Sequence, residues 1–379
     1  MRIPLAWLNL LHEKMRTAVA VAGVAFAVIL ILMQLGFYGA VLQTATRVYD
    51  ALDFDLVLIS PDYVFIARSG IIPQQRLLQA CSLEEVERAD SMYLAFTVWL
   101  NQTNGQRRGI LVMGVDPDGH AFRLADVREQ QGKLRERRHV LMDTMSRPEF
   151  GPRPPPPNGE TQVSDKTIRV VGLFTLGTGF SADGAILSSD LTFTDLFPGR
   201  TVDQVSLGLV KLKPGEDPDK VAAKLRGVLP PDTLVRTRAQ IYREESHHWV
   251  VKTSVGIIFG LGVAVSLLVG IAITYQVLAS DIDNRMPEYA TLKAMGYSPR
   301  YLSWIVLEQA WVLAVAGFVP GLVISAVLYE VTSLKAHITM TLTPTIALSV
   351  LALAVLMCSV SGLLSLRKVH GADPADLFV

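Results

Sequence analysis

The sequence predicts a membrane protein with four transmembrane α-helices and a large α+β extracytoplasmic domain between helices 1 and 2. Four long windows lack charged residues, and the segment 43–252, which separates the first window from the second, contains short strand-like runs. Only 18% of the residues are charged, against roughly 25% in soluble domains. The 35 basic and 35 acidic residues balance, so net charge predicts no nucleic-acid partner.

Each uncharged window is long enough to cross a bilayer, which takes about 20 apolar residues. The windows run Thr17–Thr46, Thr253–Ser280, Gln309–Tyr329 and Ala336–Leu366. Their length argues against the alternative that they are buried core helices. A cleaved signal peptide is an alternative for the first window. Its apolar run exceeds the roughly 7–15 residues of a signal core, which favours an uncleaved anchor.

The basic residues in short loops predict the orientation of the spans. The N-terminal tail, the 278–302 loop and the C-terminal tail hold eight of them, against Lys335 alone in the 330–341 loop. Both termini are therefore predicted to be cytoplasmic. The predicted order is an amphipathic interfacial helix at 1–16, a first span at 17–42, an extracytoplasmic domain with stalk ends at 43–252, a second span at 253–277, a cytoplasmic loop at 278–302, a third span at 303–329, a short outer loop at 330–341, a fourth span at 342–366 and a cytoplasmic tail at 367–379.

The extracytoplasmic segment alternates strand-like runs with helical stretches, which predicts an α+β fold. The Pro-rich stretch Gly151–Gly159 predicts an exposed loop and a candidate boundary between two lobes. A helix is predicted at Asp217–Val228. Gln43–Asp50 and Gln240–Val251, next to the first and second spans, are predicted to form a stalk. The strand-like runs are Phe54–Ser60, Met92–Leu100, Gly109–Val115, Ile168–Phe174 and Val205–Leu212, the last with the alternation of a half-buried strand.

The sequence lacks the common motifs of catalysis and nucleotide binding. It contains no P-loop, no H-E-x-x-H, no G-x-S-x-G and no paired CxxC. We therefore predict no catalytic residue, no metal site and no cofactor bound by this chain. Glu244 and His248 have the spacing of a helical ligand pair, but a polar helix surface is the favoured interpretation.

Two features inside the predicted spans call for explanation. Glu308 is the one acid well within a span, where a charge costs about 2.5–3.5 kcal/mol at mid-membrane. A structural hydrogen-bonding role is favoured over a proton relay, because no second acid lies in the spans. Gly256 with Gly260, and Gly317 with Gly321, form G-x-x-x-G pairs that permit close helix packing.

Short segments along the chain occur in a specific order. They are Asn9-Leu10 with Lys14-Met15-Arg16, then Pro287–Gly296, Glu308-Gln309-Ala310 and Asp373–Leu377. Together they resemble the FtsX/MacB-like permeases, a class of ABC transporters, over nearly the whole chain. Pro287 stands where that family usually has an arginine. Ser146–Gly151 (SRPEFG) and Gly172–Gly184 (GLFTLGTGFSADG) resemble the DevC branch of the class.

The resemblance implies a permease subunit of an ABC exporter in the bacterial inner membrane. ATP would be bound by a separate ABC ATPase subunit, so this chain is expected not to be an enzyme. Further expected partners are a periplasmic membrane-fusion protein, an outer-membrane TolC-like channel and a second copy of the chain, since two-fold pairing is the commonest oligomer. The DevC branch is associated with glycolipid export, so a glycolipid or another lipophilic molecule is the expected substrate. The alternative is an FtsX-like transmembrane signal transmitter that controls a periplasmic partner.

The resemblance also implies that Pro287–Gly296 docks on the ATPase as a coupling helix. Proline suits the first helical position and glycine the position just past the helix end. Apolar side chains three apart share one face, and Glu288 and Lys293 favour the helix dipole at their respective ends. The alternative is a plain surface helix. The predicted coupling residues are Pro287, Glu288, Tyr289, Leu292, Lys293, Ala294, Met295 and Gly296.

Overall fold

The computed structural model describes residues 14–156, 158–177, 182–284, 286–288, 291, 295–336 and 340–370. Most of the predicted interfacial helix at 1–16 and of the tail at 367–379 lies outside the described residues. The chain forms two units, one built from four long helices and one, Ala40–Gly256, built on a β-sheet.

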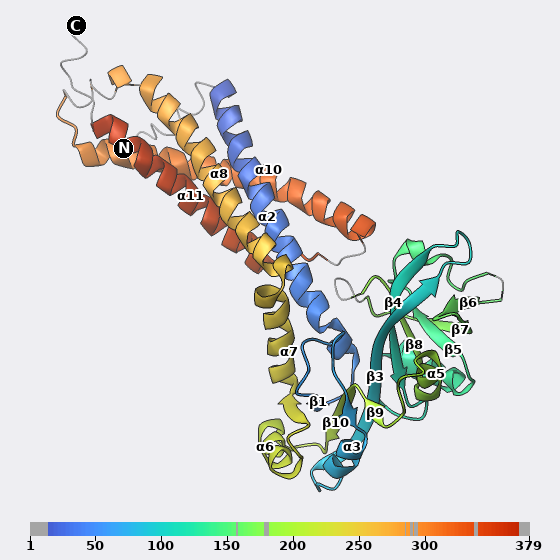
Figure 1. The fold of residues 1–379 in the computed structure, drawn as a ribbon. Coiled ribbons are helices and arrows are strands. Elements are labelled where there is room, and N and C mark those ends of the chain that lie inside the picture. The colour runs from blue at the N-terminus through green and yellow to red at the C-terminus, as the bar shows by residue number, and fades with distance from the viewer. Residues whose placement is uncertain are drawn as a thin grey trace. The chain divides into compact units, whose positions relative to one another are not determined.

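In the described part of the chain, four helices are long and apolar enough to cross a membrane, which confirms the predicted fold class (Figure 1). They are α2 (Lys14–Ala51), α8 (Ser254–Asn284), α10 (Pro299–Ala336) and α11 (Pro344–His370). The sheet unit is inserted between α2 and α8. Helices α2 and α10 have 38 residues each, or about 57 Å at 1.5 Å per residue. They are therefore longer than the roughly 30 Å hydrocarbon core of a bilayer, and they continue past the predicted span ends at 42 and 329.

Small and branched side chains form the core of the helical unit. Ala27 and Ile31 of α2, Ala314 of α10, and Ala354 and Met357 of α11 are buried in one cluster. Short side chains let the helix backbones approach closely. In a membrane this close packing stabilises helix association, because lipid tails are as apolar as the side chains and the hydrophobic effect does not drive it. Helix α8 is the least covered of the four spans, with 17% of its apolar window buried.

The second unit is built on a nine-stranded mixed sheet with the order β11-β1-β10-β3-β4-β8-β5-β7-β6. A separate two-stranded sheet pairs β2 with β9. The strands are β1 (Leu56–Ile59), β2 (Ile72–Pro73), β3 (Val86–Leu100), β4 (Arg107–Val115), β5 (His139–Asp143), β6 (Glu160–Val163), β7 (Lys166–Phe174), β8 (Ala185–Ser189), β9 (Gln204–Val205), β10 (Leu207–Leu212) and β11 (Leu234–Thr237). The helices are α3 (Gln75–Ala80), α4 (Ala125–Gln130), α5 (Asp190–Leu196), α6 (Pro218–Val228) and α7 (Arg238–His247), with shorter turns η1 (Gln131–Arg135), η2 (Pro148–Phe150) and η3 (His248–Lys252).

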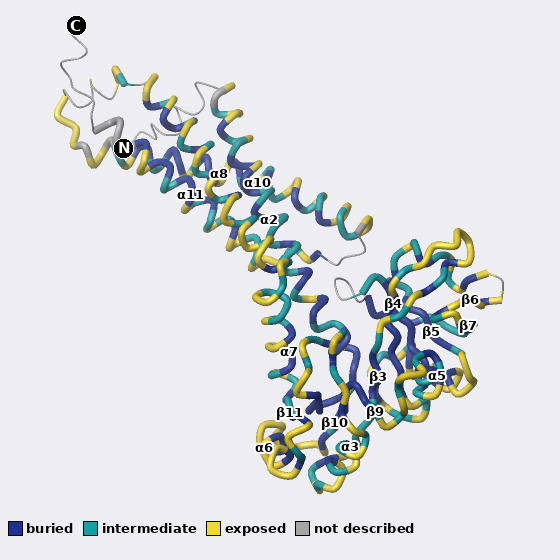
Figure 2. The backbone as a smooth tube through the Cα atoms, in the orientation of Figure 1, coloured by how far each residue is buried: buried dark blue, intermediate teal, exposed yellow. Residues whose placement is uncertain are grey.

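Alternate residues of the central strands enter two different hydrophobic clusters. Leu56 and Leu58 of β1 belong to one cluster, while Val57 and Ile59 belong to the other, because side chains along a strand point to opposite faces. Both faces of these strands are therefore buried, as the blue tube of Figure 2 shows. The half-buried pattern predicted for 205–212 is wrong: β10 lies between β1 and β3 and is buried on both faces.

Six neighbouring strands of the sheet close into a ring, in the order β3, β4, β8, β5, β7 and β6. Besides its pairing with β7, β6 pairs with the end of β3 through Trp99↔Val163 and Leu100↔Gln162. The Pro-rich stretch 151–159 lies between η2, whose Phe150 is in the same core as Val163 of β6, and β6, which is a strand of the ring. It is an irregular loop, as predicted, but it does not divide two lobes, because the strands on either side of it share one sheet and one core.

Candidate functional site

The clearest candidate site is the place where the two membrane-connected helices enter the sheet unit. The end of α2 and the start of α7 lie side by side there (Figure 1), joined by a hydrogen bond of 2.5 Å from the Tyr242 hydroxyl to Asp50 Oδ1. Val48 and Tyr49 of α2 and Ile241 of α7 are buried in the same cluster under the sheet. The predicted stalk segments are thus paired, and their sheet-side ends are part of the core of the unit.

Arg238 binds the carbonyl groups at the end of α2. Its guanidinium donates to the oxygens of Tyr49 at 3.0 Å, Phe54 at 3.2 Å and Leu52 at 3.4 Å. The last carbonyls of a helix have no partner within the helix, and a cation there also complements the helix dipole. Arg238 lies at the first position of α7, after a capping box formed by Thr237 and Gln240. One side chain of α7 therefore binds the last turn of α2 and the residues that directly follow it.

A buried row of three hydrogen-bonded side chains, Tyr49, Tyr63 and Glu245, forms a second connection between α2 and α7. The Tyr63 hydroxyl donates to Glu245 of α7, and it lies 2.6 Å from the Tyr49 hydroxyl of α2. Tyr63 has one proton to donate, so Tyr49 must be the donor in the second bond. Tyr49 and Glu245 are both fully buried. These side chains thus link α2, the loop after β1 and α7 through the interior.

Glu245 is the most unusual of these three hydrogen-bonded residues. Burial raises the pKa of its carboxyl from 4.5 to about 7, although hydrogen bonds from Tyr63 and from the Ile66 backbone act in the opposite direction. Its Oε2 atom is buried and has no hydrogen-bond partner among the described residues. A buried charge without full compensation is costly, so Glu245 retains its proton to higher pH than an exposed glutamate does. Burial also raises the pKa of Tyr63 well above its ordinary value.

The connection from α7 to α8 is interrupted. Residues His248–Lys252 form a π-helical turn, and Thr253 has an extended backbone with φ −101° and ψ 153°. The helical backbone that begins with α7 is therefore broken at Thr253, directly before α8 begins at Ser254. Gly256 lies against the turn: a Cβ there would stand 2.1 Å from the Val250 oxygen. The three atoms nearest to that Cβ all belong to Val250, in the same chain segment.

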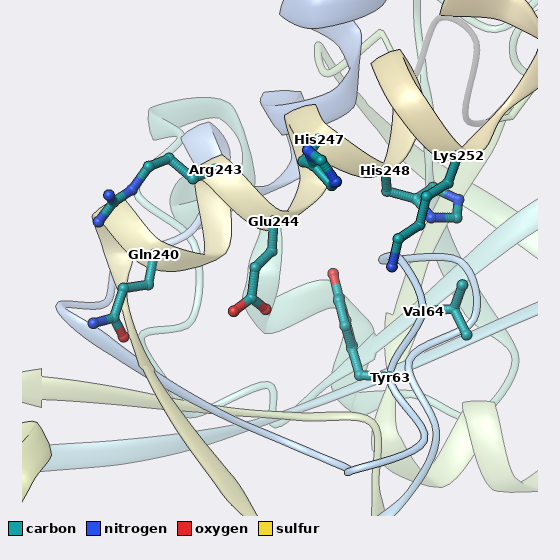
Figure 3. A pocket seen from close by; sticks show the side chains of 8 residues that line it. All are labelled: Tyr63, Val64, Gln240, Arg243, Glu244, His247, His248 and Lys252. Atoms are coloured by element: carbon teal, nitrogen blue, oxygen red, sulfur yellow. The ribbon is translucent and has the colours of Figure 1, made fainter.

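A cavity of about 620 Å³ lies beside α7 and the turn that follows it. Figure 3 shows that Tyr63 and Lys252 point into the same space next to α7. Glu244 forms an ion pair of 2.5 Å with Arg236, and the described residues include no group of three His, Cys, Asp or Glu that could hold a metal ion. The cavity is lined by Tyr63, Val64, Gln240, Arg243, Glu244, His247, His248 and Lys252.

The two segments that suggested the DevC branch meet in the structure. Arg147 binds Asp183 through its side chain at 2.9 Å and its backbone N–H at 2.9 Å. A Cβ on Gly184 would stand 2.8 Å from the Phe150 ring, and Trp99 donates to the Phe150 carbonyl at 3.0 Å. These contacts hold η2 and the start of β8 against β3. Their role in this structure is packing.

Half of the predicted coupling residues lie outside the described residues, namely Tyr289, Leu292, Lys293 and Ala294. Pro287 and Glu288 are helical, and Met295 is 63% exposed. Gly296 has φ +89°, a conformation that favours glycine. The docking role of this segment stays a prediction.

The intramembrane residues differ in what they contact. Gly317 and Gly321 of α10 face α2, where a Cβ would stand 2.5 Å from Val24 and 2.8 Å from Val28 respectively. Apart from its chain neighbours and the nearby backbone of α8, no described atom lies within 4 Å of a Cβ built on Gly260. Glu308 is half-buried in α10.

Sequence reasoning missed the residues of the junction itself, Tyr49, Tyr63, Arg238 and Glu245. One signal was present: Glu245 lies four residues after Ile241, so an acid shares the helix face that enters the core. The partners of that acid could not be identified, because Tyr63 and Glu245 are 182 positions apart.

Comparisons with known proteins match both units. The family model described as "MacB-like periplasmic core domain" matches residues 17–228, and "FtsX-like permease C-terminal" matches residues 260–374. No curated protein matches the chain. Among solved structures, the periplasmic region of MacB from Actinobacillus actinomycetemcomitans is 10% identical with a TM-score of 0.37, covering 52% of this chain and 94% of that one. The extracellular domain of the noncanonic ABC-type transporter YknZ from Gram-positive bacteria is 10% identical with a TM-score of 0.33, covering 48% of this chain and 99% of that one.

Proposed function

The chain belongs to the MacB/FtsX-like family of ABC transporter permeases, and from that premise we propose that it is the permease subunit of an exporter. A separate ABC ATPase subunit hydrolyses ATP, and this chain converts the resulting movement of its membrane helices into movement of the periplasmic domain. The protein acts in the bacterial inner membrane. It transports a glycolipid or another lipophilic molecule, as expected for the DevC branch.

The junction of α2 and α7 is the observation that supports this proposal. Both chain connections between the membrane helices and the sheet unit pass through it, and Arg238 and the Tyr49–Tyr63–Glu245 chain tie them to each other. Well-packed side chains that hydrogen-bond to one another in a protein interior are stiff and do not deform gradually. A displacement of α2 or α8 is thus passed to the sheet.

The proposed assembly contains four kinds of chain. Two copies of this permease pair with two ATPase subunits, and Pro287–Gly296 docks on the ATPase. The periplasmic domain binds a membrane-fusion protein that leads to an outer-membrane TolC-like channel.

The test begins with purification of the tagged full chain from native membranes. We expect an ABC ATPase and a membrane-fusion protein to co-purify. Recovery of a cell-wall hydrolase in place of the fusion protein would favour the alternative, an FtsX-like signal transmitter. Absence of any ATPase would refute both functions.

Coupling is tested in the same complex in nanodiscs by hydrogen–deuterium exchange, with and without vanadate-trapped ATP. Arg238→Ala removes the contacts to the end of α2. We expect it to preserve ATP hydrolysis but to abolish the ATP-dependent change of exchange in the sheet unit. Arg236→Ala is the matched control, because Arg236 lies two positions away and pairs with Glu244. If Arg238→Ala leaves the ATP-dependent change intact, the junction does not transmit it.

A further inference from the structure

The cavity beside α7 has an ordered lining. Gln240, Arg243, Glu244, His247 and His248 follow one another at helical spacing, so they share one face. Lys252 closes the row at the end nearest to α8 in the chain, and Tyr63 and Val64 form the opposite wall (Figure 3). A volume of about 620 Å³ is within the range of roughly 300–1,000 Å³ for small-molecule sites. The space is larger than a single inorganic ion requires.

The charge of this lining favours an anion. Lys252 and Arg243 form no ion pair with a carboxylate in the described part of the chain, whereas Glu244, the one acid of the lining, is paired with Arg236. Burial and the nearby Lys252 lower the pKa of His248. Its Nδ1 atom is buried without a partner among the described residues, and its ring stacks on Phe65 at 5.0 Å. The positive charge thus comes from the two ends of the row.

The position of Lys252 relative to the bilayer follows from the length of the second span. The uncharged run 253–280 begins directly after Lys252. At 1.5 Å per residue it is about 42 Å long, which equals the roughly 40–45 Å thickness of a bilayer with its headgroup regions. Lys252 is therefore at the level of the outer headgroups. The rest of the row continues away from the span along the chain, toward Arg243 and Gln240.

We propose that this cavity binds the headgroup of an anionic phospholipid with a polyol, such as phosphatidylglycerol, from the outer leaflet of the membrane. The lipid phosphate contacts Lys252, since the phosphate is the part of a headgroup nearest to the acyl chains. The polyol extends along α7, where Glu244 and His247 offer acceptors and donors for hydroxyl groups. Arg243 at the far end disfavours a cationic headgroup such as choline. The site does not depend on the transported substrate or on ATP.

The binding experiment uses the delipidated full chain in nonionic detergent and native mass spectrometry. Phosphatidylglycerol, phosphatidylcholine and soluble glycerol phosphate are added in separate titrations. We expect saturable binding of phosphatidylglycerol, weaker binding of phosphatidylcholine and little binding of glycerol phosphate, which lacks the membrane-anchored chains. Lys252→Gln should weaken phosphatidylglycerol binding about tenfold, as expected for the loss of one charge-assisted contact. Arg243→Gln should reduce the preference over phosphatidylcholine.

Lys220→Gln is the matched control, because Lys220 of α6 is exposed and lies outside the cavity. Thermal unfolding of each variant confirms that it is folded. Equal binding of the two lipids by the unmodified chain, or equal losses for Lys252→Gln and Lys220→Gln, would overturn the proposal. Glycerol phosphate that binds as tightly as the lipid would assign the cavity to a soluble phosphate and would overturn the lipid assignment. None of these outcomes depends on whether the protein is an exporter.

Discussion

Replacement of Glu245 by glutamine should stabilise the sheet unit at alkaline pH. Glutamine is neutral at every pH and has nearly the same shape, and its amide oxygen can still accept the hydrogen bond from Tyr63. The native carboxyl must ionise in an interior where Oε2 has no partner among the described residues. The variant removes that cost and retains the connection between α7 and the loop that carries Tyr63.

The magnitude follows from the pKa of Glu245. Burial raises this pKa from 4.5 to about 7 in the folded protein, and a pKa difference of one corresponds to about 1.36 kcal/mol. The rise therefore corresponds to about 3 kcal/mol. Between pH 4.5 and pH 7 the folded state holds a proton that the unfolded state has lost, so the stability of the native protein falls as pH rises through this window. Below pH 4.5 the native protein and Glu245→Gln should have similar stability, and above pH 7 Glu245→Gln should be more stable by up to about 3 kcal/mol.

Thermal unfolding of the full chain in detergent at pH 5 and pH 8, followed by tryptophan fluorescence, measures this effect. For a domain of this size 1 kcal/mol corresponds to about 2–4 °C in Tm, so the variant should gain up to roughly 6–12 °C at pH 8 and little at pH 5. Glu244→Gln is the control. Its carboxylate is partly exposed and paired with Arg236, and such a surface pair contributes about 0–1 kcal/mol. A Tm difference between Glu245→Gln and the native protein that is the same at both pH values would refute the reasoning.

Three further predictions concern the membrane unit. Reporter fusions at Gly159 and Val379 should report opposite sides of the membrane, and reports from the same side would contradict the topology. Leu292→Asp or Met295→Asp should abolish ATPase binding or transport without affecting membrane insertion, because each places a charge in the proposed apolar contact with the ATPase. Normal ATPase binding and transport by both variants would show that this segment does not couple the ATPase to the permease. Gly321→Ala should destabilise the helical unit by about 1–3 kcal/mol in thermal unfolding, because the added methyl group overpacks against Val28. Gly260→Ala is the control and should not destabilise the unit. Equal effects of the two substitutions would argue against the contact between α2 and α10.

Local patterns in the sequence were enough to find most elements of the fold. The four spans are visible because a helix in lipid must be apolar over its whole length. Asp217 caps α6, whose first residue is Pro218, and both residue types favour a helix start wherever it lies in the protein. These signals depend on neighbours within a few positions.

The predictions from the sequence were wrong where a feature depends on which distant elements pack against it. Val205–Leu212 was predicted to be half-buried, but β10 has strands on both sides and a hydrophobic cluster on each face. The loop 151–159 was a candidate boundary because of its composition, yet β5 before it and β6 after it belong to one ring of strands that the pairing of β6 with β3 closes. Neither the neighbouring strand nor the closing pair can be identified from the residues themselves.

The sequence by itself determined that this protein spans a membrane four times, that a folded domain is inserted after the first span, and that the chain resembles the ABC permeases. Each of these properties is encoded in hydrophobic runs, charge bias and ordered motifs along the chain. Only the tertiary structure decided that Arg238 binds the end of α2 and that Tyr63 hydrogen-bonds to both Glu245 and Tyr49 in the interior. The physical reason is that burial and hydrogen bonding join groups almost 200 positions apart, and no local pattern records which groups folding brings together.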